Sequence, residues 1–139
     1  MAISNSRFLH NQAGYKGFPA GQGGALYVGG GTVTITNSSL ENNEAGVVKF
    51  AFGAKFAFGS QFQGAGGALY VGGGTVTITN SRLLNNAGGA GHGGGAICAS
   101  GSTVKVVRSV LEGNSAGGNG ARAFASHSTP QHSVAHHNR

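Results

Sequence analysis

The sequence contains no Asp and only three carboxylates, all of them Glu, against nine Lys and Arg. It also has no Trp, two Pro and a single Cys, Cys98. The lack of Asp excludes mechanisms that depend on an Asp pair, an Asp-rich calcium site or an Asp that orients a His. The single Cys98 excludes an internal disulfide. No run approaches the roughly 20 apolar residues of a membrane helix, so we expect no membrane span, and we expect no signal peptide.

Glycine is abundant instead, with 28 residues in a chain of 139. The glycines do not follow a three-residue period, which excludes collagen. Hydrophobic residues make up 39% and charged residues 9% of the chain, a balance that argues against charge-driven disorder. We therefore expect one folded domain over residues 1–139, with glycine at its turns.

An internal repeat organises the chain. Residues 23–38 and 66–81 both read GGALYVGGGTVTITNS, and residues 94–109 read GGAICASGSTVKVVRS. Each copy is followed by the pattern S-x-L-x-x-N, which also opens the chain at Ser6 to Asn11. Repeat copies thus lie near 1–11, 23–43, 66–86, 94–114 and, in a worn form, 120–138. Units of this size, with tolerated insertions, are typical of the coils of a β-solenoid.

Within each unit the residue pattern alternates as in a β-strand. In TVTIT, Val33 and Ile35 face one way and the threonines face the other. Because the third copy places Lys105 among the threonines, that side must face outward. By the same logic Leu26 and Val28 face inward, Tyr27 and Tyr70 face outward, and the alanine column of Ala25, Ala68 and Ala96 is also expected outward.

One Asn recurs at the end of every repeat, and we interpret the set as a structural ladder. Stacked coils lie about 4.8 Å apart, so successive amides could hydrogen-bond along the stack. The alternative is that Asn merely tolerates a left-handed turn conformation. The predicted ladder residues are Asn11, Asn43, Asn86, Asn114 and Asn138.

These motifs carry a resemblance. GGA-[LI]-[YC] followed by S-x-[FL]-x-x-N resembles the GGA[ILV] and FxxN repeats of the polymorphic outer membrane protein family, within the wider pectate-lyase-like group. The resemblance implies an all-β fold, a right-handed parallel β-helix of about four to five coils. It also implies a cell-surface or extracellular location. Only Phe8 keeps the family's Phe, since the other clear copies have Leu.

Residues 47–63 form a Phe-rich insertion that lengthens one repeat. Alternation of Phe with Ala or Gly predicts a strand or hairpin, with two lysines as gatekeepers. It could be a flap over the solenoid wall or an open coil end, a sticky surface for a protein partner or a second copy, or a stacking platform for sugars or bases. The predicted interaction surface comprises Lys49, Phe50, Phe52, Lys55, Phe56, Phe58 and Phe62.

We expect no catalytic, cofactor or metal site. Glu41 and Glu112 fall at the same place in two coils about 10 Å apart, beyond the usual range of a hydrolytic carboxylate pair. The late histidines, His127, His132, His136 and His137, have no carboxylate or Cys cluster nearby to complete a metal site. The chain is therefore predicted to be a non-catalytic structural or adhesive module that self-associates or binds a protein partner.

Two alternatives remain open. The first is an anionic polysaccharide that is bound or cleaved along Lys105, Arg108 and Arg82, because a net charge of +6 favours acidic partners. We do not expect nucleic acid to be the partner. The outward threonines resemble the regular arrays of ice-binding proteins, although Thr is also an ordinary outward strand residue. This threonine face comprises Thr32, Thr34, Thr36, Thr75, Thr77 and Thr79.

Overall fold

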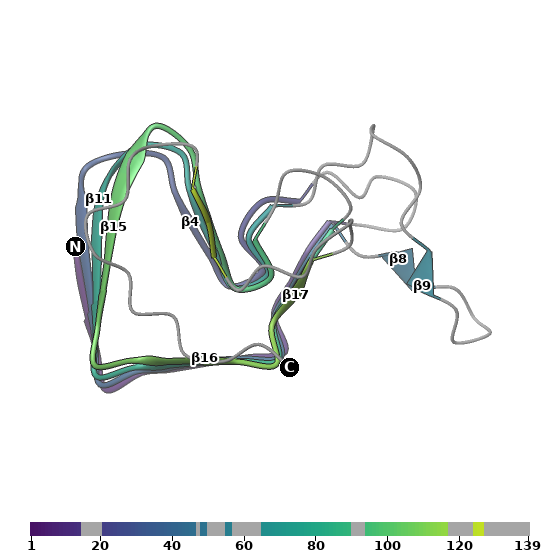
Figure 1. The fold of residues 1–139 in the computed structure, drawn as a ribbon, viewed down its shortest axis with the longest axis horizontal. Helices are drawn as coiled ribbons and strands as arrows, with labels where there is room; N and C mark the ends of the chain where they lie inside the picture. The colour runs from purple at the N-terminus through teal and green to yellow at the C-terminus, as the bar shows by residue number, and fades with distance from the viewer. Residues whose placement is uncertain are drawn as a thin grey trace.

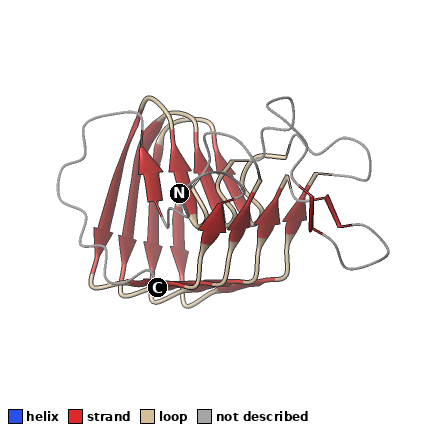
Figure 2. Ribbon diagram, turned by 45° about the vertical axis from the view of Figure 1, so that its right-hand side comes forward, coloured by secondary structure: helices blue, strands red, loops and turns tan. Residues whose placement is uncertain are grey.

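The computed structural model describes residues 1–14, 21–46, 48–49, 55–56, 65–89, 94–116 and 124–126. These residues form an all-β structure in which no helix occurs. Four sheets have four parallel strands each, and a short antiparallel pair stands apart (Figure 1, Figure 2). Strands of one sheet come from successive repeats, so the chain visits the sheets in turn and then starts again. This arrangement is consistent with a β-helix or solenoid.

The strands are short, and each passage of the chain through the four sheets adds one strand to each of them. The first sheet contains β1 (Ala2–Ser4), β5 (Thr32–Thr36), β11 (Gly74–Thr79) and β15 (Ser102–Val107). The second contains β2 (Arg7–Leu9), β6 (Ser39–Glu41), β12 (Arg82–Leu84) and β16 (Val110–Glu112). The third contains β3 (Gln12–Ala13), β7 (Glu44–Ala45), β13 (Ala87–Gly88) and β17 (Ser115–Ala116). The fourth contains β4 (Leu26–Val28), β10 (Leu69–Val71), β14 (Ile97–Ala99) and β18 (Phe124–Ser126).

The repeats pair with one another at equivalent positions. Ile35 lies beside Ile3 on one side and Ile78 on the other, and Leu40 lies between Phe8 and Leu83 in the same way. Seen down the stack, the strands of each sheet therefore superpose (Figure 1). The 43-residue spacing between Asn43 and Asn86 does not disturb this register, and the additional residues fall in the sequence between β7 of the third sheet and β10 of the fourth.

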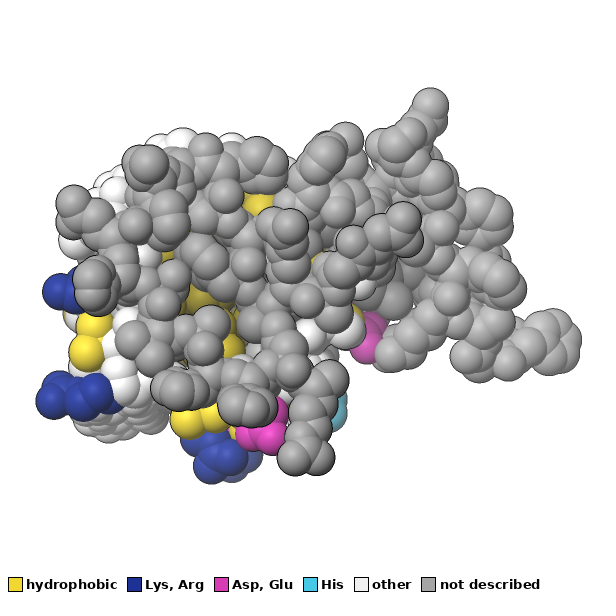
Figure 3. Space-filling view, viewed as in Figure 1, with side chains coloured by type: hydrophobic (Ala, Val, Ile, Leu, Met, Phe, Trp, Pro, Cys, Tyr) yellow, Lys and Arg dark blue, Asp and Glu magenta, His cyan; other side chains and the backbone are white. Residues whose placement is uncertain are grey.

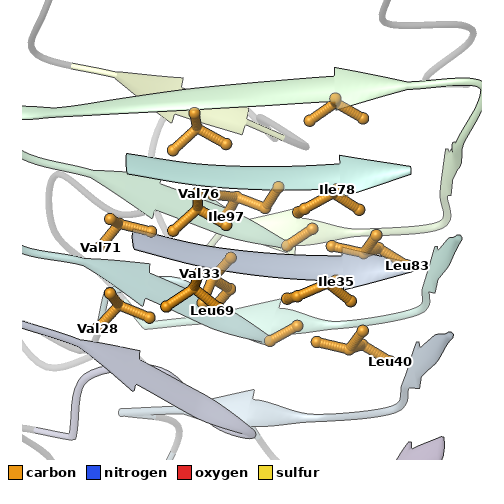
Figure 4. Close-up of a cluster of buried hydrophobic side chains, with 14 of the residues drawn as sticks. Val28, Val33, Ile35, Leu40, Leu69, Val71, Val76, Ile78, Leu83 and Ile97 are labelled. Atoms are coloured by element: carbon orange, nitrogen blue, oxygen red, sulfur yellow. The ribbon is translucent and has the colours of Figure 1, made fainter. Parts of the chain in front are cut away.

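The core is a set of apolar columns that run along the stack (Figure 4). Valine and isoleucine of the first sheet face leucine and valine of the second and fourth sheets. Burial of such side chains is worth about 1.5–3 kcal/mol each, so the short strands are stabilised mainly through this shared interior. The labelled members are Val28, Val33, Ile35, Leu40, Leu69, Val71, Val76, Ile78, Leu83 and Ile97.

The alanine column was predicted on the wrong side. Ala68 and Ala96 are fully buried, and Ala25 is half-buried. They lie on a bend that precedes the strands of the fourth sheet, so the alternation of the strand does not extend to them. Tyr27, which is within β4, is 60% exposed and does face outward.

The glycine pair before each alanine allows the fourth sheet to approach the third. A Cβ atom on Gly67 would lie 2.0 Å from the carbonyl oxygen of Gly95 and 2.6 Å from the backbone of Ala87. Gly66 has a φ of +70°, which disfavours any other residue. Backbone therefore packs directly on backbone here, and only glycine fits at this position.

Candidate interaction surfaces

The asparagine ladder (Asn11, Asn43, Asn86 and Asn114) lies at the corner between the second and third sheets. The Oδ1 atoms of Asn43, Asn86 and Asn114 each accept two hydrogen bonds, from the backbone N–H and the side-chain amide of the Asn in the preceding repeat. Between Asn43 and Asn86 both distances are 3.0 Å. Three of the four residues are buried, so the ladder satisfies backbone groups that water cannot reach. Asn138 lies outside the described residues.

A second polar ladder of serines lies at the corner between the first and second sheets. Ser38 Oγ accepts from the backbone N–H of Ser6 at 3.2 Å and donates to the Thr36 carbonyl at 2.8 Å. Ser81 and Ser109 repeat the pattern. This role was not predicted from the sequence, although the serine recurs in S-x-L-x-x-N as regularly as the asparagine. Both ladders are internal and hold the corners in place.

The residue before each ladder residue takes the left-handed backbone conformation. Before the serines these are Asn5, Asn37, Asn80 and Arg108, with φ between 47° and 49°. Before the asparagines they are His10, Asn42, Asn85 and Gly113, with φ between 53° and 64°. Asn and Gly adopt this conformation at low cost, whereas Arg does not. Tolerance of a left-handed turn and ladder formation are thus separate roles of adjacent residues.

Arg108 combines backbone strain with an exposed charge. Its φ is 47°, and its Nε donates a 3.1 Å hydrogen bond to Asn80 Oδ1. Strained residues outside glycine often mark functional sites. Here the guanidinium lies at the outer edge of the corner between the first and second sheets.

The basic corner is the surface formed there by Arg7, Arg82 and Arg108. Arg7 and Arg82 belong to one outward column of the second sheet, with Ser39 between them. A groove of about 420 Å³ runs along this column and is also lined by Asn5, Asn37 and Asn80. Figure 3 shows Lys and Arg side chains at the left and lower edges of the molecule, with one Glu side chain beside the lower group and another farther right. Three arginines at one corner favour an anionic ligand there.

A second groove, of about 460 Å³, follows the corner between the second and third sheets. Its lining includes His10, Gln12, Asn42, Glu44 and Asn85. These side chains supply hydrogen-bond donors and acceptors and no large apolar surface. Within the described residues no group of three or more His, Cys, Asp or Glu side chains could hold a metal ion.

The threonine face is the outer surface of the first sheet. Thr32, Thr34 and Thr36 pair in register with Thr75, Thr77 and Thr79. Their side chains are exposed or half-buried, while the valines and isoleucines between them are buried. All six threonines of the expected face therefore share one side of the sheet.

The expected aromatic interaction surface falls largely outside the described residues. Phe50, Phe52, Phe58 and Phe62 are not among them. For Lys49, Lys55 and Phe56 the structure gives the backbone pairing of β8 (Val48–Lys49) with β9 (Lys55–Phe56), which is antiparallel. This strand pair projects away from the four stacked sheets (Figure 1, Figure 2).

A different aromatic pair lies on the fourth sheet. The rings of Tyr27 and Tyr70 are stacked, with centroids 5.4 Å apart and planes inclined by 10°. The pair follows from the parallel register of β4 and β10, which places identical residues side by side. The third member of this column is Cys98, a buried thiol whose pKa is raised above its ordinary value by burial.

The carboxylates do not form a close pair in the second sheet. Glu41 and Glu112 occupy one column with Leu84 between them, which separates them by two strand spacings, or about 10 Å. Glu41 accepts a hydrogen bond from Ser39 Oγ. Paired-carboxylate hydrolysis uses separations of about 5–9.5 Å, so this column does not match that chemistry.

No protein-family model, curated protein or solved structure matches this chain. The described residues include no helix long and apolar enough to cross a membrane.

Proposed function

We propose that this chain is a non-catalytic structural or adhesive module that acts through its outer surfaces and associates into a larger assembly. In this proposal it is a right-handed parallel β-helix, similar to the polymorphic outer membrane protein repeats. Connections between parallel strands of one sheet are right-handed in about 98% of cases, which supports the handedness. The in-register stacking of four repeats supports the solenoid.

The observation that carries the proposal is where the polar groups lie. Within the described residues, every buried side-chain nitrogen or oxygen atom has a hydrogen-bond partner. The internal Asn and Ser side chains are committed to the ladders, so the interior serves the fold. Contacts with other molecules then depend on the outer faces and on the projecting strand pair β8–β9.

The aromatic insertion is the proposed contact with a second copy or a protein partner. The strand pair β8–β9, the described part of the insertion, projects from the stack, which supports a contact with another molecule. Five phenylalanines in residues 47–63 would make such a contact largely apolar.

Light scattering of the native particle tests this role. The wild type is compared with a variant lacking residues 49–62 and with a variant in which the five phenylalanines are replaced by serine. A third variant replaces Lys49 and Lys55 by serine and keeps the aromatic residues as a control. We expect a smaller particle for the first two variants only. An unchanged particle mass in all variants would exclude the insertion as the contact.

The basic corner favours a second candidate function, the binding of an anionic polysaccharide along the stack. The arginines supply charge-assisted hydrogen bonds to acidic groups, and the amides of Asn5, Asn37 and Asn80 are suited to sugar hydroxyls. A glycan array read at low and high salt tests it, because an electrostatic ligand is released by screening.

Variants for that test can be taken from the other repeats. Arg82→Ser introduces the residue found at Ser39 in the same column, and Arg108→Asn introduces the residue found at Asn80. Both replacements are therefore compatible with the fold. We expect the double variant to lose binding and Lys105→Thr, on the neighbouring face, to retain more of it. Salt-independent binding would contradict the electrostatic reading.

A further inference from the structure

We propose that the outer face of the first sheet binds the surface of ice, an activity independent of the function proposed above. Besides the six paired threonines, Thr103 lies beside Thr75, and Ser4 lies beside Thr36. Seven threonines and one serine therefore form one continuous outward array. The remaining outward positions of this sheet are Ala2, Lys105 and Val107.

The array repeats regularly in two directions. Neighbouring strands place equivalent hydroxyls about 4.8 Å apart along the stack, and successive outward residues on one strand lie about 6.6 Å apart. The register is exact over Thr32, Thr34 and Thr36 against their counterparts on β11. A two-dimensional lattice of this kind matches a crystalline ligand better than a single flexible molecule.

The side chains of the array are also held in place. Thr is β-branched and strongly restricted at χ1, so its hydroxyl and methyl groups keep fixed directions. The strands beneath are locked by parallel pairing on both sides of β5 and β11. Little conformational entropy is then lost when an ordered ligand meets the face.

Chemistry points to water as that ligand. Each hydroxyl both donates and accepts a hydrogen bond, as each water molecule does, while each methyl group limits competing orientations of nearby water. The block of six paired threonines contains no charge that would hold water in its own shell. Neither groove described above is lined by a threonine of this face.

The array ends on β15. Lys105 lies beside Thr77, and Val107 lies beside Thr79, so the third repeat replaces two hydroxyls by a charged and an apolar side chain. An ammonium group is strongly hydrated and would disturb a lattice of ordered water. Equivalent positions of this face therefore hold Thr on β11 and Lys or Val on β15. The fold accepts both kinds of residue there, so exchanges between the two strands are suitable test variants.

Thermal hysteresis and inhibition of ice recrystallisation of the purified protein test the proposal. We expect activity in the wild type and a loss to the buffer level in Thr77→Lys, which copies the residue at the neighbouring register position. The matched control is Ser115→Lys, which adds the same charge to an exposed residue of the third sheet. We expect this control to behave as the wild type.

The opposite change extends the array. Lys105→Thr with Val107→Thr continues two threonine columns onto β15, and we expect a rise in hysteresis above the wild-type value. Circular dichroism melts identify the variants that fold. The proposal is overturned if neither the wild type nor the folded double variant shows activity, or if Thr77→Lys retains it.

Discussion

Replacement of Asn86 by alanine tests the asparagine ladder at a fully buried position. The Asn86 side chain takes part in four hydrogen bonds. Its Nδ2 donates to the carbonyl of Leu40 and to Asn114 Oδ1, both at 2.9 Å. Its Oδ1 accepts from the backbone N–H and the amide of Asn43, both at 3.0 Å. Alanine removes all four.

The expected loss of stability follows from the groups left behind. The backbone N–H of Asn43 and one hydrogen of its amide lose their acceptor in a fully buried site. A buried group without a partner costs about 1–3 kcal/mol, so these two donors together predict a loss of about 2–6 kcal/mol. A domain of this size has about 5–15 kcal/mol of total stability, so Asn86→Ala is expected to be near the limit of folding.

Asn11→Ala is the matched control, because it makes the same change at the exposed end of the same ladder. The Asn11 side chain donates one bond, 2.9 Å long, to Asn43 Oδ1, which keeps its bond from the Asn11 backbone. We expect a loss of about 1 kcal/mol or less. Urea unfolding at equilibrium measures both variants. If Asn86→Ala and Asn11→Ala lose equal free energy of unfolding, burial is not the reason that the ladder stabilises the fold.

Three further predictions concern the backbone and the thiol. Gly67→Ala is expected to cost about 3 kcal/mol by denaturant unfolding, whereas Gly30→Ala, with open space around its Cβ, should change stability by less than about 0.5 kcal/mol. Arg108→Asn should raise the melting temperature by about 4 °C, since Asn relieves about 1 kcal/mol of left-handed strain; an unchanged or lower value contradicts this. Burial raises the pKa of Cys98 above 9.0, so the folded state holds this proton more tightly than the unfolded chain. The stability of the wild type should therefore fall as the pH rises through 9.0, relative to Cys98→Ala; parallel pH profiles would contradict this.

Much of the architecture can be predicted from the sequence, because the same residue patterns recur along the chain. Two identical 16-residue segments must adopt similar structures, and alternation within TVTIT assigns Val33 and Ile35 to the interior. The recurrence of the S-x-L-x-x-N pattern places one Ser and one Asn at fixed points of each repeat. The all-β class with parallel pairing between repeats follows from these features.

Only the tertiary structure shows which side chains are buried at the bends and which backbone segments approach one another. Alternation fails at a bend, so Ala68 and Ala96 are buried against expectation. The role of Gly67 depends on the backbone of Gly95 and Ala87, which only the closure of the third sheet on the fourth brings near.

Function depends still more on that spatial arrangement. The sequence alone places threonines outward and arginines at intervals, and it determines their number and order. Only the register of the sheets turns them into a lattice on one face and a basic groove at one corner. The physical reason is that binding depends on distances between side chains of different repeats, and these distances are set by hydrogen bonds between strands far apart in the chain.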